Sequence, residues 1–157
     1  MKLTLKNLVA TTLLLAAAAV AATTATPAQA ADALGEANKK IVLAFYDAAL
    51  VKRDVDSAVQ YLGATYVQHN PTAPDGVEGV KGLIKFLAEK YPQRTSDIKR
   101  VMADGNLVML HVHSKPTPQD RGTAIVDIFR VENGKIVEHW DVMQPVPETA
   151  KNNNTMF

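Results

Sequence analysis

Hydrophobic residues recur at helical spacing in the first half of the chain and alternate with polar residues in the second half. The clearest helical stripe follows the spacing i, i+3, i+4, i+7, i+8 and consists of Ile41, Ala44, Phe45, Ala48 and Ala49. This stripe predicts an amphipathic helix from Ala33 to about Val51.

A second, short helix is predicted directly after the first. Asp54 or Asp56 is suited to cap its start, because a short acidic side chain accepts hydrogen bonds from the free N–H groups there. We expect it to run to about Leu62, where Gly63 would stop it.

A short strand and a third helix follow. The segment TYVQHNP reads as a strand that ends at Pro71, and Val77–Tyr91 as a helix that Pro92 ends. The core face of this helix would consist of Val80, Leu83, Ile84 and Leu87.

The remaining chain alternates like a set of strands. Its four strand-like segments are SDIKRVMADG, NLVMLHVHSK, TAIVDIFRVENG and KIVEHWDVMQPV. Asp104-Gly105 and Asn133-Gly134 are hairpin turn signals. Helices followed by an antiparallel meander predict an α+β fold, in which a curved sheet packed with three helices forms a cone that encloses a pocket.

The alternation assigns side chains to faces. On the third of these segments Thr123, Ile125, Asp127 and Phe129 share a face; on the last, Val137, His139, Asp141 and Met143 share one, and Ile136, Glu138, Trp140 and Val142 share the other. A buried carboxylate costs several kcal/mol unless it is paired, so Asp127 and Asp141 need partners. The candidates are His139 and His111, and such a pair in an apolar cone would make a general base.

Other polar and aromatic residues are candidates for binding a substrate in the pocket. On TYVQHNP, Tyr66, Gln68 and Asn70 share one face, and Val67 and His69 share the other. The candidate binding residues are Tyr66, Gln68, His69, Asn70, His111 and Trp140. Ordinary packing is the alternative for each, and for Trp140 the alternative is a place in the core or an interface.

The sequence carries little sign of other chemistries. His111-Val112-His113 matches two ligands of a cupin-like metal site, but cupins are all-β, so we expect no metal and no cofactor. There is no G-x-S-x-G, no H-E-x-x-H and no phosphate loop after a buried strand. The absence of cysteine excludes thiol catalysis and disulfides.

The N-terminal residues 1–30 are typical of a bacterial secretory signal peptide. Lys2 and Lys6 precede an apolar run, and Ala28-Gln29-Ala30 fits the cleavage pattern. We therefore expect a periplasmic or secreted protein with one domain at 31–157. Without the two lysines the 17 basic residues become 15 against 16 acidic ones, a net charge of −1. This balance favours neither nucleic acid nor a membrane surface as a partner.

Three stretches resemble the SnoaL-like proteins of the nuclear-transport-factor-two-like superfamily. They are YVQHNP, DGVEGVKGLIKFL and DIFRVENGKIVEHWDVMQ, and the resemblance extends over essentially the whole of residues 31–157. The last motif is similar to the branch that is predicted to catalyse aldol condensation. The resemblance implies a cone-shaped α+β fold, which also hosts isomerases, hydrolases and binding modules.

The resemblance also implies roles for two positions. In the polyketide cyclases of this family an aspartate on the last strand is the base, and this position falls on Asp141. The histidine beside it falls on Asp127, so this chain departs from the pattern and two carboxylates would face each other.

Three hypotheses for the function follow. The first is an enzyme that does acid/base chemistry next to a carbonyl, with Asp141, Asp127 and His139 as catalytic candidates. The second is a module that binds a small apolar ligand without chemistry. The third is a structural homodimer that uses the outer face of the sheet, and a homodimer is expected in any of the three cases.

Overall fold

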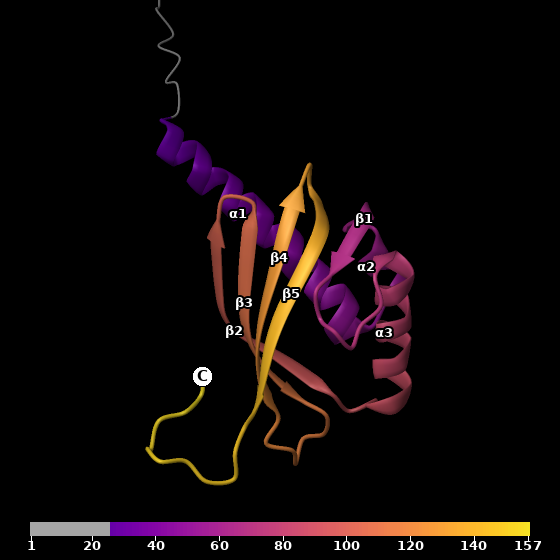
Figure 1. Ribbon diagram of the computed structural model, residues 1–157, viewed down its shortest axis with the longest axis vertical. Helices are drawn as coiled ribbons and strands as arrows, with labels where there is room; N and C mark the ends of the chain where they lie inside the picture. Colours follow the sequence, from indigo (N-terminus) through magenta and orange to yellow (C-terminus); the bar gives the residue numbers. More distant parts are fainter. Residues whose placement is uncertain (1–25) are drawn as a thin grey trace, which may run out of the picture.

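The described part of the chain is a five-stranded sheet packed with helices. A computed structural model describes residues 26–157. Its helical elements are α1 (Pro27–Tyr46), the π-helix η1 (Asp47–Lys52), α2 (Val55–Val59) and α3 (Gly76–Lys90). Its strands are β1 (Leu62–Gln68), β2 (Thr95–Asp104), β3 (Leu107–Lys115), β4 (Thr123–Glu132) and β5 (Lys135–Pro145). Figure 1 shows α1 crossing one face of the sheet and α3 standing beside β1.

The sheet is mixed and open. Its order is β1-β5-β4-β3-β2; the last four strands are joined as antiparallel neighbours, and β1 pairs parallel with β5. The predicted α+β fold with a curved antiparallel or mixed sheet and three helices is confirmed. Because β1 lies next to β5, residues from both ends of the domain meet on this side of the sheet.

The core lies between α1, α3 and the inner face of the sheet. Val108, Leu110 and Val112 of β3 are fully buried and alternate with less buried residues. From the helices, Val42 and Ile84 are also fully buried. The predicted stripe on the first helix is confirmed at Phe45, Ala48 and Ala49, which are all buried.

The start of α1 and the end of α2 differ from the prediction, and the first helix continues past Tyr46 as the π-helix η1. α1 begins at Pro27, because Thr26 and Gln29 form a reciprocal capping box. α2 ends at Val59, and Gly63 lies inside β1, so its expected role as a helix stop is wrong. A Cβ at Gly63 would lie 2.9 Å from Val137 Cγ1, so the glycine permits close approach of β1 and β5.

A bulge in β5 changes the predicted assignment of faces. Arg130 pairs with Glu138 but Val131 pairs with Ile136, so Val137 is an extra residue in β5. Ile136 and His139 consequently lie on the same, buried face, and the expectation that they lie on opposite faces is wrong. Strict alternation holds from Glu138 onward.

Most of the predicted signal peptide lies outside the described residues. Its residues 26–30 form the cap and start of α1 and are exposed. Within residues 26–157, no helix combines the length and the apolar character that a membrane crossing requires.

Two glycines on α3 give a matched pair of substitutions. A Cβ at Gly79 would lie 2.2 Å from the Pro74 carbonyl oxygen, whereas a Cβ at Gly82 would meet nothing within 4 Å. We expect Gly79→Ala to lower the free energy of unfolding by roughly 1–3 kcal/mol, because the loop before α3 must shift. Gly82→Ala should raise it by about 0.5–1 kcal/mol, since alanine is the better helix former. Urea unfolding of both variants checks this, and equal effects would contradict the close packing of the loop on α3.

Candidate functional site

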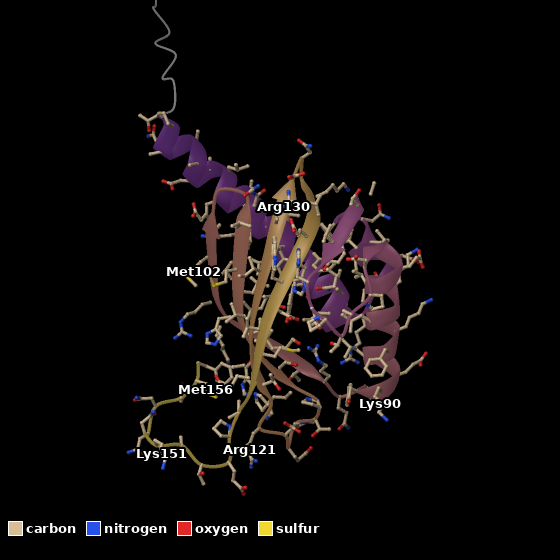
Figure 2. The ribbon with its side chains drawn as sticks, in the orientation of Figure 1. Lys90, Met102, Arg121, Arg130, Lys151 and Met156 are labelled. Carbon is tan, nitrogen blue, oxygen red and sulfur yellow. The ribbon has the colours of Figure 1, made fainter. Side chains whose placement is uncertain are left out.

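A cavity of about 800 Å³ lies between α3, the loop before it, the end of α1 and the inner face of β4 and β5. Its walls are largely apolar and include Phe45, Val80, Ile84, Ile125 and Phe129. Figure 2 shows the side chains that project from the strands toward α3. Polar groups in such a place act with reduced competition from water.

Three titratable side chains of the sheet converge in this cavity. Asp127 of β4 pairs in register with Asp141 of β5, and Phe129 pairs with His139, so all three polar side chains share the inner face. Asp127 and His139 are buried and Asp141 is half-buried. One ligand atom from each lies within 4.8 Å of the others. The sheet thus brings together the three residues that the sequence favours as catalytic.

Hydrogen bonds fix the tautomer of His139. The backbone N–H of Asn70 donates to Gln68 Oε1 at 2.9 Å, which identifies that atom as the amide oxygen. His139 Nδ1 lies 2.9 Å from the same oxygen, so Nδ1 carries a proton and donates it. His139 Nε2 lies 3.0 Å from Asp127 Oδ1.

This arrangement places one shared proton between His139 and Asp127. With Nδ1 protonated, the Nε2 contact needs a further proton on either Nε2 or Asp127 Oδ1. Burial raises the pKa of Asp127, and the hydrogen bond from His139 opposes that rise. The pair is neutral overall in both forms, which removes most of the cost of burying it.

Asp141 is held differently, by an amide. The backbone N–H of Thr72 donates to Asn70 Oδ1 at 2.8 Å, which leaves Asn70 Nδ2 as the donor of that side chain. Nδ2 reaches both oxygens of Asp141, at 2.9 Å and 2.7 Å. Both oxygens of Asp141 therefore accept from Asn70, and further lone pairs of these oxygens stay available. The two aspartates differ in environment, which is how proteins give two carboxyl groups different tasks.

Tyr66 adds a donor to the same wall. It is 5% exposed and lines the cavity. Burial raises the pKa of Tyr66, and the nearby charges of Asp127 and Asp141 raise it further. The phenol consequently keeps its proton at any physiological pH.

Three of the candidate binding residues lie away from the cavity. His69 and Trp140 are on the outer face, where their rings stack at 4.7 Å and His69 Nε2 lies 2.8 Å from Glu138 Oε1. His111 pairs in register with Val126 and lies 3.0 Å from Arg100 Nη1, while Leu110 is opposite Asp127. The expectation that His111 could pair with Asp127 is therefore wrong. Tyr66, Gln68 and Asn70, the other three candidates, line the cavity.

Asp127, His139 and Asp141 are also the residues that could hold a metal ion. In this arrangement both ring nitrogens of His139 and both oxygens of Asp141 already take part in hydrogen bonds. The donor set is thus organised as a hydrogen-bond network. An ion bound by His139 Nε2 and the two carboxylates would have to displace the proton that His139 and Asp127 share.

Among the cavity residues that the sequence reasoning missed are two with large polar side chains. Tyr46 of α1 and Arg94, between α3 and β2, both line the cavity. Tyr46 follows Phe45 of the apolar stripe, and its polar tip on a core face is a signal that could have been used. Arg94 follows the proline that ends a helix, and nothing local marks it.

The fold is similar to that of several solved structures. A structure of TsrD from Streptomyces laurentii has a TM-score of 0.58 at 19% identity, over 69% of this chain and 88% of that one. A candidate polyketide cyclase from Bacillus cereus has a TM-score of 0.59 at 21% identity, over 68% and 74%. AclR, a candidate hydroxylase from Streptomyces galilaeus, has a TM-score of 0.60 at 20% identity, over 70% and 90%. At these identities the likeness shows the fold alone.

The family follows from a sequence match. No curated protein matches the chain. The model of the SnoaL-like domain matches residues 42–139, which is more than half of the chain and includes Asp127 and His139. The resemblance to the SnoaL-like proteins seen in the sequence is thereby confirmed. The chain belongs to the SnoaL-like family.

Proposed function

We propose that the protein is an enzyme that does acid/base chemistry next to the carbonyl of a small apolar substrate, without a cofactor. The reaction class is aldol condensation, cyclisation or isomerisation. The observation that supports it is the pair of carboxyl groups held in two different ways in one largely apolar cavity.

In this proposal Asp141 is the base. It removes a proton from the carbon beside the carbonyl, and the electron pair of that C–H bond forms the enolate. Tyr66 and Gln68 stabilise the enolate oxygen, because Gln68 Oε1 is occupied by Asn70 and His139 and its Nε2 remains as a donor. The enolate carbon then attacks a second carbonyl or takes a proton back, and Asp141 returns its proton to the product.

Asp127 and His139 act here as positioning residues. Their shared proton keeps the pair neutral, and His139 Nδ1–H orients the Gln68 amide. Asn70 has the same task for Asp141. The loop 69–75 thus orients both Asp141 and the Gln68 amide, because Asn70 bonds to each of them.

Deuterium exchange tests the proposal. The protein in heavy water should accelerate exchange of the hydrogens beside the carbonyl of an apolar ketone, such as a decalone, as followed by NMR. The alternative is a non-catalytic module that binds an apolar ligand in the same cavity. Binding of the ketones without exchange above the buffer rate would favour that alternative.

We also propose that the chain is secreted and forms a homodimer. Cleavage near Ala30 would fall in the exposed first turns of α1, ahead of Gly35, its first buried residue. The outer face of the sheet carries the exposed side chains of Met102 and Val142, which suits a dimer. Figure 2 shows Met102 on the opposite side of the molecule from Lys90 at the end of α3. Intact mass and sedimentation of the secreted protein check both; a chain that keeps residues 1–30, or a monomer, would contradict them.

A further inference from the structure

Three buried hydrogen-bonding groups beside the cavity have no hydrogen-bond partner within the described residues. The Tyr46 hydroxyl, Arg94 Nη1 and Ser96 Oγ are all buried, and none has a hydrogen-bond partner among residues 26–157. Tyr46 and Arg94 line the cavity itself. Buried polar groups are nearly always hydrogen-bonded, so this set needs an explanation.

The three groups are neighbours. Ser96 and Arg94 both lie near enough to the Tyr46 hydroxyl to affect its pKa, which burial raises. The phenol is therefore a permanent donor. Burial lowers the pKa of Arg94, but a guanidinium still keeps its proton in a protein. The two hydroxyls can donate and accept, whereas the guanidinium can only donate. Asp127 Oδ2 is a further buried atom without a hydrogen-bond partner among residues 26–157, and its charge acts on both Tyr46 and Arg94.

The backbone of Arg94 is held rigidly. The guanidinium of Arg53 donates to the carbonyl oxygens of Pro92 at 2.9 Å and Arg94 at 2.8 Å. Arg53 itself has a φ of 59°, so the chain reverses at this point and brings its side chain onto the turn before β2. The cavity thus contains the Arg94 guanidinium, and the backbone of that residue is held by hydrogen bonds from Arg53.

The positive charge of Arg94 has no direct ion pair within the described residues. Burying a charge without a partner costs several kcal/mol. Apart from Arg94, the groups on the cavity wall that carry full charges when alone are acidic or belong to the neutral pair: Asp75, Glu78, Asp141, and Asp127 with His139. Of the described residues on the cavity wall, Arg94 thus offers an entering anion a full positive charge, whereas Asp75, Glu78 and Asp141 repel it.

We propose that Arg94 and Tyr46 form a carboxylate-binding subsite, so that the ligands of this cavity are small apolar carboxylic acids. The carboxylate takes the bidentate hydrogen bonds of the guanidinium, and the Tyr46 hydroxyl donates to the same group. Resting on the proposed function, this makes the substrate a carbonyl compound that also bears a carboxylate. Arg94 would then position its reacting carbon for Asp141.

A pair of probes tests the subsite without any reaction. Naphthalene-2-carboxylate and naphthalene-2-carboxamide share shape and apolar area but differ in charge. The wild-type protein should bind the carboxylate about 10- to 100-fold more tightly than the amide, as measured by titration calorimetry. Arg94→Met should abolish this preference, and Tyr46→Phe should reduce it.

Two variants serve as controls. Arg121→Met removes an exposed arginine outside this cavity and should keep the full preference. Arg121 lies in the loop before β4, at the lower end of the view in Figure 2. Arg94→Lys keeps the positive charge but loses the two parallel N–H donors of the guanidinium, so it should retain part of the preference. This variant replaces Arg94→Met as the test if Arg94→Met does not fold. Equal affinity of both probes for the wild type would overturn the proposal. So would an unchanged preference in Arg94→Met, or an unchanged preference in both Tyr46→Phe and Arg94→Lys.

The carboxylate subsite and the proposed acid/base function can be refuted independently of each other. Asp141→Asn removes a negative charge from the cavity wall, so the preference for the carboxylate should persist or increase. Preference without deuterium exchange in any ketone or keto acid would refute the proposed function and leave the subsite standing. Exchange without preference would refute the subsite alone.

Discussion

Replacing His139 with leucine should lower the free energy of unfolding by about 3–5 kcal/mol at neutral pH, because it leaves a buried charge unpaired. His139 is the hydrogen-bond partner of Asp127 Oδ1, and Asp127 Oδ2 has none within residues 26–157. Urea unfolding at pH 7 measures the loss. His111→Leu is the matched control, since His111 lies on the outer face and should change stability far less.

The loss should depend on pH in a defined direction. Burial already raises the pKa of Asp127, and His139 gives the largest opposing contribution. A raised folded-state pKa means that folding favours the protonated carboxyl. The protonated Asp127 carboxyl therefore contributes its full stabilisation below the ordinary aspartate pKa of about 3.9. This contribution is lost as the pH rises through the folded-state pKa of Asp127.

In the His139→Leu protein this pH-dependent loss should be larger, so its deficit relative to the wild type should shrink on acidification. The double variant Asp127→Asn, His139→Leu carries no buried charge at this position and should recover much of the stability at pH 7. A deficit that is independent of pH and persists in the double variant would indicate lost packing on Phe129, whose ring lies 4.7 Å from His139.

Replacing Asp141 with asparagine should reduce deuterium exchange by about 10²- to 10⁴-fold, the usual contribution of a positioned general base. The shape of the side chain is kept, so the Michaelis constant for the ketone should change little. Exchange rates by NMR over a range of ketone concentrations separate the two effects.

Asp97→Asn is the matched control for this substitution. Asp97 is an exposed aspartate on β2 that pairs with Lys99 and lies outside the cavity. Exchange by Asp97→Asn should equal that of the wild type. A loss of similar size in both variants would mean that Asp141 has no special part in the chemistry.

The placement of Asp127 was predictable because β4 alternates without interruption. Its neighbours Ile125 and Phe129 on the same face are apolar, and all three are buried. For β5 the same rule places His139 and Asp141 together, but it fails at Ile136, because the bulge at Val137 leaves no mark in the hydrophobic pattern. Alternation thus predicts the faces of side chains within a regular strand segment, but it does not reveal where a bulge interrupts the strand.

Contacts between distant strands could not be read from the chain. Whether His111 or His139 meets Asp127 depends on hairpin register, and the observed register places Leu110 opposite Asp127. The bond from His139 to Gln68 needs the parallel pairing of β1 with β5, which local patterns do not specify. Arg94 was missed for a similar reason, since its setting is made by Arg53, which lies far from it in sequence.

The most direct measurement compares the wild type and Asp141→Asn on one ketone, with binding and exchange recorded in the same samples. We expect both proteins to bind the ketone with similar affinity. The wild type should exchange the hydrogens beside the carbonyl well above the buffer rate, and Asp141→Asn should not. Equal exchange by the two proteins at equal occupancy, or exchange by neither, would contradict the assignment of Asp141 as the base.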